Sequence, residues 1–153
     1  MRSARFMLTG LIVLLPTLSR AQAPARPAVP KLEPIAETRL LMEGLAHPNF
    51  KALDRLLSEG ETDAEAWQFA RGQSLLLAET ANLLMLRPPK TAKAEAAWMA
   101  RTTEFRDASV KLAGSMTAKD APKSQAALMA LAASCNRCHK TFRVETRIKM
   151  SEK

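Results

Sequence analysis

The chain has 153 residues, which is enough for one domain with a modest core. Its formal net charge is +8, but basic and acidic residues are interspersed, without a long basic run or an aromatic platform, and this argues against nucleic-acid binding. Ala, Leu and Met favour helices and are frequent, the five glycines are few, and no strand-like alternation is present, so we predict an all-α fold.

The N-terminus has the pattern of a secretory signal peptide, predicted to cover residues 1–21. Arg2 and Arg5 form a positive region, and residues 6–18 are mostly apolar but fall short of the ~20 residues that span a bilayer as a helix. Cleavage after Ala21 follows a small-x-small pattern. The leader predicts export to the periplasm, and an uncleaved N-terminal anchor is the alternative.

Residues 22–34 are rich in Pro and Ala, with a proline at every third or fourth position. Proline removes an amide donor and biases the residue before it away from the helical region, so this segment is predicted to be an extended, solvated linker. A single domain is predicted to follow, over residues 35–150.

The first helix of that domain is predicted over Ile35–Ala46. One face of this helix carries four residues at helical spacing, Ile35, Thr38, Met42 and Leu45. Pro48 is predicted to break the helix, with a short second helix over Phe50–Leu57 that ends at Gly60.

A long helix is predicted next, over about residues 63–86, and it begins with a capping box at residues 62–65. Its main apolar stripe is Trp67, Ala70, Ser74, Leu77, Ala81 and Leu84. The stripe is broadened by Phe69, Leu76, Leu83 and Leu86, which indicates a helix buried on much of its circumference.

Two more helices are predicted, over about residues 92–116 and 121–148, capped by Thr91 and Asp120. The first of these has a buried stripe of Trp98, Thr102, Phe105, Ser109, Leu112 and Met116. The last has one face of Leu128, Leu131, Cys135, Cys138, His139 and Phe142. Four principal helices with short connections predict an antiparallel four-helix bundle.

The strongest chemical signal is the Cys-x-x-Cys-His motif of residues 135–139 in the last helix. This spacing is typical of c-type haem attachment, in which each thiol adds to a haem vinyl group and the histidine becomes an iron ligand. Residues three and four apart share a helix face, so one porphyrin can meet Cys135, Cys138 and His139 together. The motif and the leader together predict one covalently bound haem c.

Residues 135–143 read Cys-Asn-Arg-Cys-His-Lys-Thr-Phe-Arg and resemble the C-x-x-C-H-x-x-F-R signature of the class II cytochromes c, the cytochrome c prime family. Over the rest of the chain the resemblance is one of architecture. It implies that His139 is the proximal iron ligand, that Arg143 lies beside it near the haem edge, and that Phe142 packs against the ring. A simpler role for Arg143 is to complement the C-terminal end of the helix dipole.

Members of this family differ in what occupies the side of the iron opposite the proximal histidine. Some relatives have five-coordinate iron and bind gases, whereas a low-spin subgroup uses a methionine of the first helix and carries electrons. Met42 is the candidate ligand here, although a methionine on an apolar helix face also serves as core. The family's first helix often has an arginine four residues before the distal position, whereas Arg39 precedes Met42 by three. Leu41 or Leu45 covering an open site, and His47 as a second imidazole, are alternatives.

We therefore predict a periplasmic monohaem cytochrome that carries single electrons, with binding of NO or CO as the alternative. A haem-free helical protein that uses Cys135 and Cys138 as a disulfide or, with His139 and His47, as a zinc clamp is a third interpretation. No nucleophile-base pair, Gly-rich phosphate loop or paired carboxylates are evident, so no enzymatic activity is predicted. Expected partners are the haem-attachment machinery and a redox protein with an acidic docking face, and the resemblance allows a homodimer.

Overall fold

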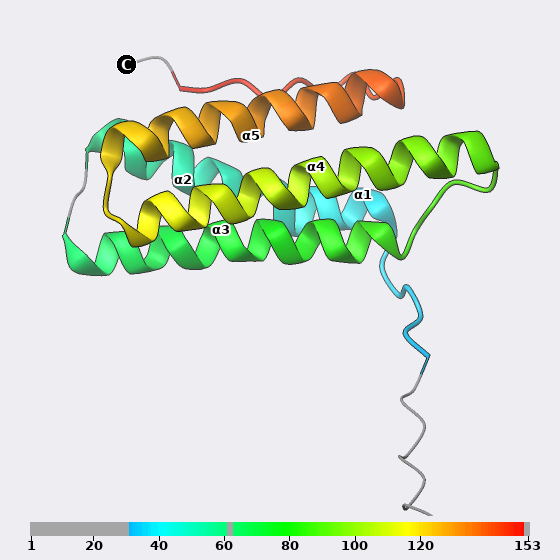
Figure 1. Ribbon diagram of the computed structural model, residues 1–153, viewed down its shortest axis with the longest axis horizontal. Helices are drawn as coiled ribbons and strands as arrows, with labels where there is room; N and C mark the ends of the chain where they lie inside the picture. Colours follow the sequence, from blue (N-terminus) through cyan, green and yellow to red (C-terminus); the bar gives the residue numbers. More distant parts are fainter. Residues whose placement is uncertain (1–30, 61–62, 152–153) are drawn as a thin grey trace, which may run out of the picture. The chain divides into compact units, whose positions relative to one another are not determined.

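The computed structural model describes residues 31–60 and 63–151, and every regular element in this part of the chain is helical (Figure 1). The elements are α1 (Thr38–Leu41), η1 (Met42–Ala46), α2 (His47–Glu59), α3 (Ala64–Met85), α4 (Ala92–Thr117) and α5 (Ala121–Thr141). The first three elements follow one another without a break, so the domain has four long helices in an antiparallel bundle, and the predicted fold class is confirmed.

The predicted signal peptide lies outside the described residues, as does most of the predicted linker. Residues 31–34, at the end of that linker, are exposed and not helical. None of the helices in the described ranges combines the length and the apolarity that a membrane span requires.

The first helix runs from Thr38 to Glu59, and our prediction of two helices separated at Pro48 is wrong. Proline lacks an amide donor, and in an α-helix its ring clashes with the carbonyl four residues back. The five residues of η1 form a π-helical turn, in which the amide of His47 donates to the carbonyl of Met42, five residues back. This wider turn accommodates Pro48 without ending the helix. The prediction for Ile35 is also wrong, because it precedes the helix and is 92% exposed.

Helix α3 begins at an aspartate cap and buries the stripe that its sequence predicts. The carboxylate of Asp63 accepts a hydrogen bond from the amide of Ala66 at 2.7 Å, so the cap is one residue later than predicted, and Thr62 lies outside the described residues. All six residues of the main stripe are buried. Burial on much of the circumference is not observed, because Phe69, Leu76 and Leu86 are 39–49% exposed.

Helices α4 and α5 follow the predicted pattern over most of their length. The six residues of the predicted α4 stripe are all buried. The indole nitrogen of Trp98 in α4 donates to the carbonyl of Leu84 in α3 at 2.7 Å, which joins these two helices at one end of the bundle. Asp120 caps α5 as predicted, accepting from the amide of Lys123 at 2.9 Å.

Helix α5 ends at Thr141, and its predicted extension to residue 148 is wrong. Arg143 has a φ of 58°, in the left-handed region. The amide of Val144 donates to the carbonyl of His139 at 2.8 Å and that of Arg143 to Lys140 at 3.4 Å, the two bonds of a Schellman motif. The chain then reverses, and residues 144–151, which we call the C-terminal strap, run back beside α5 (Figure 1).

Candidate haem-attachment site

The three residues of the motif lie in the last two turns of α5, on a half-buried face. Cys135, Cys138 and His139 are each partly accessible, and both cysteines are free thiols. The same face continues into the core through Leu128 and Leu131, which are fully buried. The helix therefore presents both thiols and the imidazole on one half-buried face that leaves them reachable.

Both thiols are held in the protonated form. Burial raises the pKa of Cys135 from 9.0 to about 12, and the neighbouring Cys138 adds to this rise. Burial also raises the pKa of Cys138, partly offset by the positive charge of Arg101. A buried thiol that stays neutral is a poor metal-binding thiolate, but it retains the S–H bond that adds across a vinyl group.

The imidazole of His139 has a defined tautomer. Its Nδ1 lies 2.7 Å from the carbonyl oxygen of Thr146 in the strap. A carbonyl can only accept, so Nδ1 carries a proton, and in the neutral imidazole the lone pair of Nε2 is free. A ligating histidine usually makes such a hydrogen bond through its second nitrogen. The donor set therefore fits a haem: two thiols for the vinyl groups and one imidazole, whose Nε2 can bind the iron.

Aromatic side chains border the site at the end of α5. The ring of Phe142 packs edge-on against Trp98 of α4, with centroids 5.1 Å apart. Trp98 is buried, and Phe142 is half-buried against the core cluster, as predicted for a packing residue. Its contact with a haem ring stays a prediction.

Met42 is the first residue of the π-helical turn η1 and is half-buried against the core. Among the described residues, no Cα atom of α1 or η1 lies within 8 Å of one in α5. Where two helices pack directly against each other, some Cα atoms of one helix lie within about 8 Å of Cα atoms of the other. The α1 and η1 segments of the first helix are thus not in direct backbone contact with α5, and ligation of iron by Met42 stays a prediction.

The other candidate ligands are not brought to the motif. His47 is exposed at the junction of η1 and α2. In the described ranges, no three His, Cys, Asp or Glu side chains form a group that could hold a metal ion, so the zinc interpretation lacks an assembled ligand set. Arg143 is exposed and lies in the turn after α5, not in the helix as predicted.

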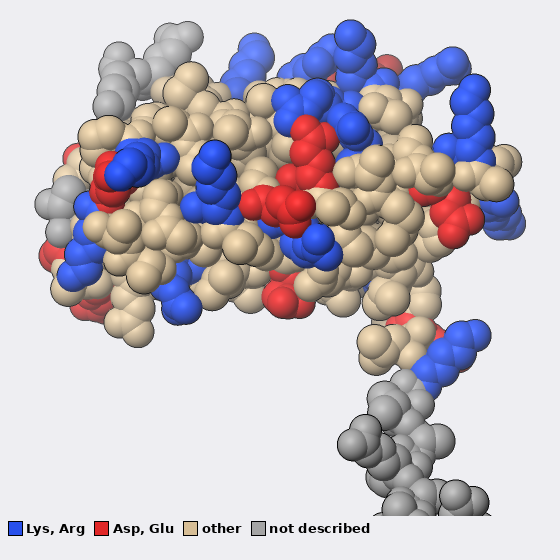
Figure 2. All heavy atoms as spheres, in the orientation of Figure 1, with Lys and Arg blue, Asp and Glu red and all other residues tan. Residues whose placement is uncertain are grey.

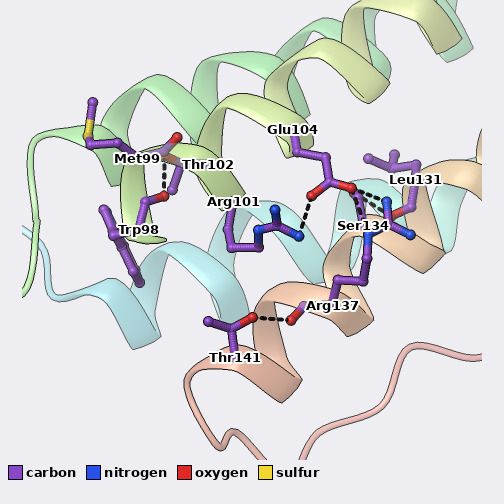
Figure 3. A network of polar contacts seen from close by, with 9 residues as sticks. All are labelled: Trp98, Met99, Arg101, Thr102, Glu104, Leu131, Ser134, Arg137 and Thr141. Atoms are coloured by element: carbon purple, nitrogen blue, oxygen red, sulfur yellow. Dashed lines mark hydrogen bonds and ion pairs between the residues drawn. The ribbon is translucent and has the colours of Figure 1, made fainter. Parts of the chain in front are cut away.

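Polar contacts around the motif were not predicted from the sequence. Glu104 of α4 accepts from Arg137, the central residue of the motif, with 2.6 Å to its Nε, and pairs with Arg101 at 2.9 Å (Figure 3). Asn136 and Asp54 bind the strap. No local pattern signals these pairs, because their partners are 12 to 97 residues apart in sequence.

Comparison with known proteins supports the family resemblance that the motif indicates. A family model described as Cytochrome C' matches residues 34–143, which includes all four helices and the motif. No curated protein matches the chain significantly.

Proposed function

Because the chain belongs to the cytochrome c prime family and is therefore a haem protein, we propose that it is a monohaem c-type cytochrome that carries single electrons. The observation that carries this proposal is the shared face of α5 with Cys135, Cys138 and His139. The two thiols would hold one haem covalently, and the imidazole would ligate its iron. When bound, the haem supplies a one-electron Fe(III)/Fe(II) couple. The proposal includes no enzymatic role, because the amino-acid sequence shows no nucleophile-base pair, Gly-rich phosphate loop or paired carboxylates.

The residues around the motif would exclude water from the cofactor. Trp98 and Phe142 form an apolar wall at the end of α5, and the half-buried Met42 and Leu45 belong to the first helix. We propose Met42 as the sixth iron ligand. A thioether is a soft donor, and a Met/His pair raises the reduction potential and resists gas binding, which suits an electron carrier.

The proposed location is the periplasm. The support is the predicted signal peptide of residues 1–21 together with the motif, because covalent haem attachment in bacteria takes place outside the cytoplasm. The haem-attachment machinery of that compartment would then be the first partner of this chain.

We propose that electrons enter or leave through a basic edge. Lys and Arg side chains gather along the side of the molecule where α5 and the strap run (Figure 2). The residues of this edge are all exposed, and they are Arg137, Lys140, Arg143, Arg147 and Lys149. Such an edge favours a redox protein with an acidic docking face, because complementary charge steers encounter. Electron exchange should then slow as ionic strength rises.

The optical spectrum of the purified ferric and ferrous protein tests the proposal. A pyridine haemochrome assay first shows whether haem is attached covalently. A low-spin spectrum that does not change on adding CO supports electron transfer. A five-coordinate, high-spin spectrum that responds at once to CO would instead favour gas binding, and absence of covalent haem would leave only the haem-free interpretation.

The role of Met42 is tested by substitution. Met42→Ala should convert the spectrum from low-spin to high-spin, because the thioether ligand is lost. Met129→Ala is the matched control, since Met129 is 57% exposed on α5. An unchanged spectrum in Met42→Ala would remove this residue from the iron.

A further inference from the structure

We propose that the C-terminal strap is a positioning element for His139, and that the carbonyl of Thr146 lowers the reduction potential of the haem. This inference rests on the proposed function, because it assumes that His139 ligates iron. Phe142 is followed by a left-handed turn at Arg143 that directs the strap back along α5. The strap thereby carries a backbone carbonyl to the side of the imidazole that faces away from the iron-binding nitrogen.

The strap is fastened next to this carbonyl by an asparagine of the motif. The Oδ1 of Asn136 accepts from the amide of Ile148 at 2.8 Å, and its Nδ2 donates to the carbonyl of Ile148 at 2.9 Å. This pair of bonds satisfies both backbone groups of one residue and fixes the register of the strap against α5. Thr146, two residues earlier, is then held opposite His139, with 2.7 Å between the carbonyl oxygen and Nδ1.

A buried carboxylate fastens the far end of the strap. Asp54 of α2 is 2% exposed. It accepts from the amide of Ser151 at 3.1 Å and from its hydroxyl at 2.8 Å, and Lys51 lies 3.2 Å away. A buried carboxylate requires such donors, so the contact is specific. Ile148, at the first fastening, and Met150, between the two fastenings, pack against the core cluster. The strap therefore joins α2 to α5 and is not a loose terminus.

The chemical consequence follows from the direction of the hydrogen bond. An imidazole that donates Nδ1–H to a carbonyl becomes a more basic ligand through Nε2. A more basic ligand stabilises Fe(III) relative to Fe(II), and the reduction potential falls. The hydrogen bond also restricts rotation of the ring. Residues 144–151 thus adjust the cofactor without touching the iron.

The experiment uses the full, haem-loaded protein and two variants that release the carbonyl. One variant ends at Val144, which retains the Schellman motif and removes the strap. The other is Asn136→Leu, which removes both bonds to Ile148 and leaves α5 intact. Thr146→Ala is the matched control, because it changes the side chain and keeps the carbonyl. Covalent haem content, reduction potential and solvent exchange of the His139 Nδ1 proton by NMR are measured for each.

We expect both variants to retain covalent haem, to exchange the Nδ1 proton faster and to have a higher reduction potential. A tenfold change in the reduction equilibrium corresponds to about 59 mV for a one-electron couple. Thr146→Ala should have the same haem content, reduction potential and Nδ1 proton exchange as the wild type. Full haem content with an unchanged potential or unchanged proton exchange in Asn136→Leu would overturn the inference and leave the proposed function standing. If the wild-type protein carries no covalent haem, both this inference and the proposed function are overturned.

Discussion

Two helices of this bundle end with a basic residue in a conformation that favours glycine. Lys119 follows α4 with a φ of 53°, and Arg143 follows α5 with a φ of 58°. The left-handed region costs an L-residue about 1–2 kcal/mol, and glycine avoids this cost. Glycine also makes the unfolded chain more flexible, and this additional entropy offsets part of the stabilisation. We therefore expect Arg143→Gly to stabilise the fold by about 1 kcal/mol, which raises Tm by about 4 °C.

Urea unfolding of the haem-loaded protein, followed by circular dichroism, measures this difference. A covalently attached haem stays on the unfolded chain, so cofactor dissociation does not complicate the comparison. Lys140→Gly is the control, because Lys140 is exposed inside the last turn of α5 and glycine in a helix costs about 1 kcal/mol. Replacement by glycine should thus stabilise the fold at position 143 and destabilise it at position 140. If Arg143→Gly destabilises the fold as Lys140→Gly does, the turn is not left-handed and the reasoning fails.

Lys119→Gly separates the effect on the fold from any effect on the haem. It should stabilise the protein by a similar amount, because Lys119 also occupies the left-handed position of a Schellman motif. Lys119 follows the end of α4 and precedes α5, whereas the motif lies in the last two turns of α5. If Arg143 lies beside the proximal histidine, as the family resemblance implies, its positive charge should influence the iron, and Arg143→Gly alone should shift the reduction potential. Equal potentials in the two variants would leave Arg143 with only its role in the turn.

Three further outcomes are expected. Asp63→Ala should cost about 1 kcal/mol in urea unfolding, because it removes the side-chain cap of α3. Trp98→Ala should cost about 3–5 kcal/mol by the same measurement, since it removes a buried ring, its contact with Phe142 and the donor to Leu84. In haem-free protein, Cys135 ionises at a pKa of 9.0 when unfolded and about 12 when folded, so stability falls as pH rises through this window, by about 2 kcal/mol at about pH 10.5. Comparison with Cys135→Ala at pH 8 and 10.5 isolates this loss, which should vanish once haem occupies the thiol.

Local features of the sequence determined the bundle and the face that carries the motif. The stripes of α3 and α4 repeat every three or four residues, and a period of 3.6 residues per turn puts such residues on one side of a helix. The predicted cap of α5, Asp120, lies within four residues of the amide that it binds. The spacing of Cys135, Cys138 and His139 likewise needs only the geometry of one helix. These predictions succeeded because their causes act over one or two turns.

The tertiary structure decided where the first and last helices end and what fixes the proximal histidine. Pro48 predicts a break, but a π-helical turn keeps the helix continuous, and packing of its two halves against one core offsets the irregular hydrogen bonding. Arg143 gives no sequence signal for a left-handed turn. The turn is compatible with a strap whose far contact, from Asp54 to Ser151, spans 97 residues. A contact of that separation leaves no periodic pattern, so the carbonyl of Thr146 beside His139 is visible only in the folded chain.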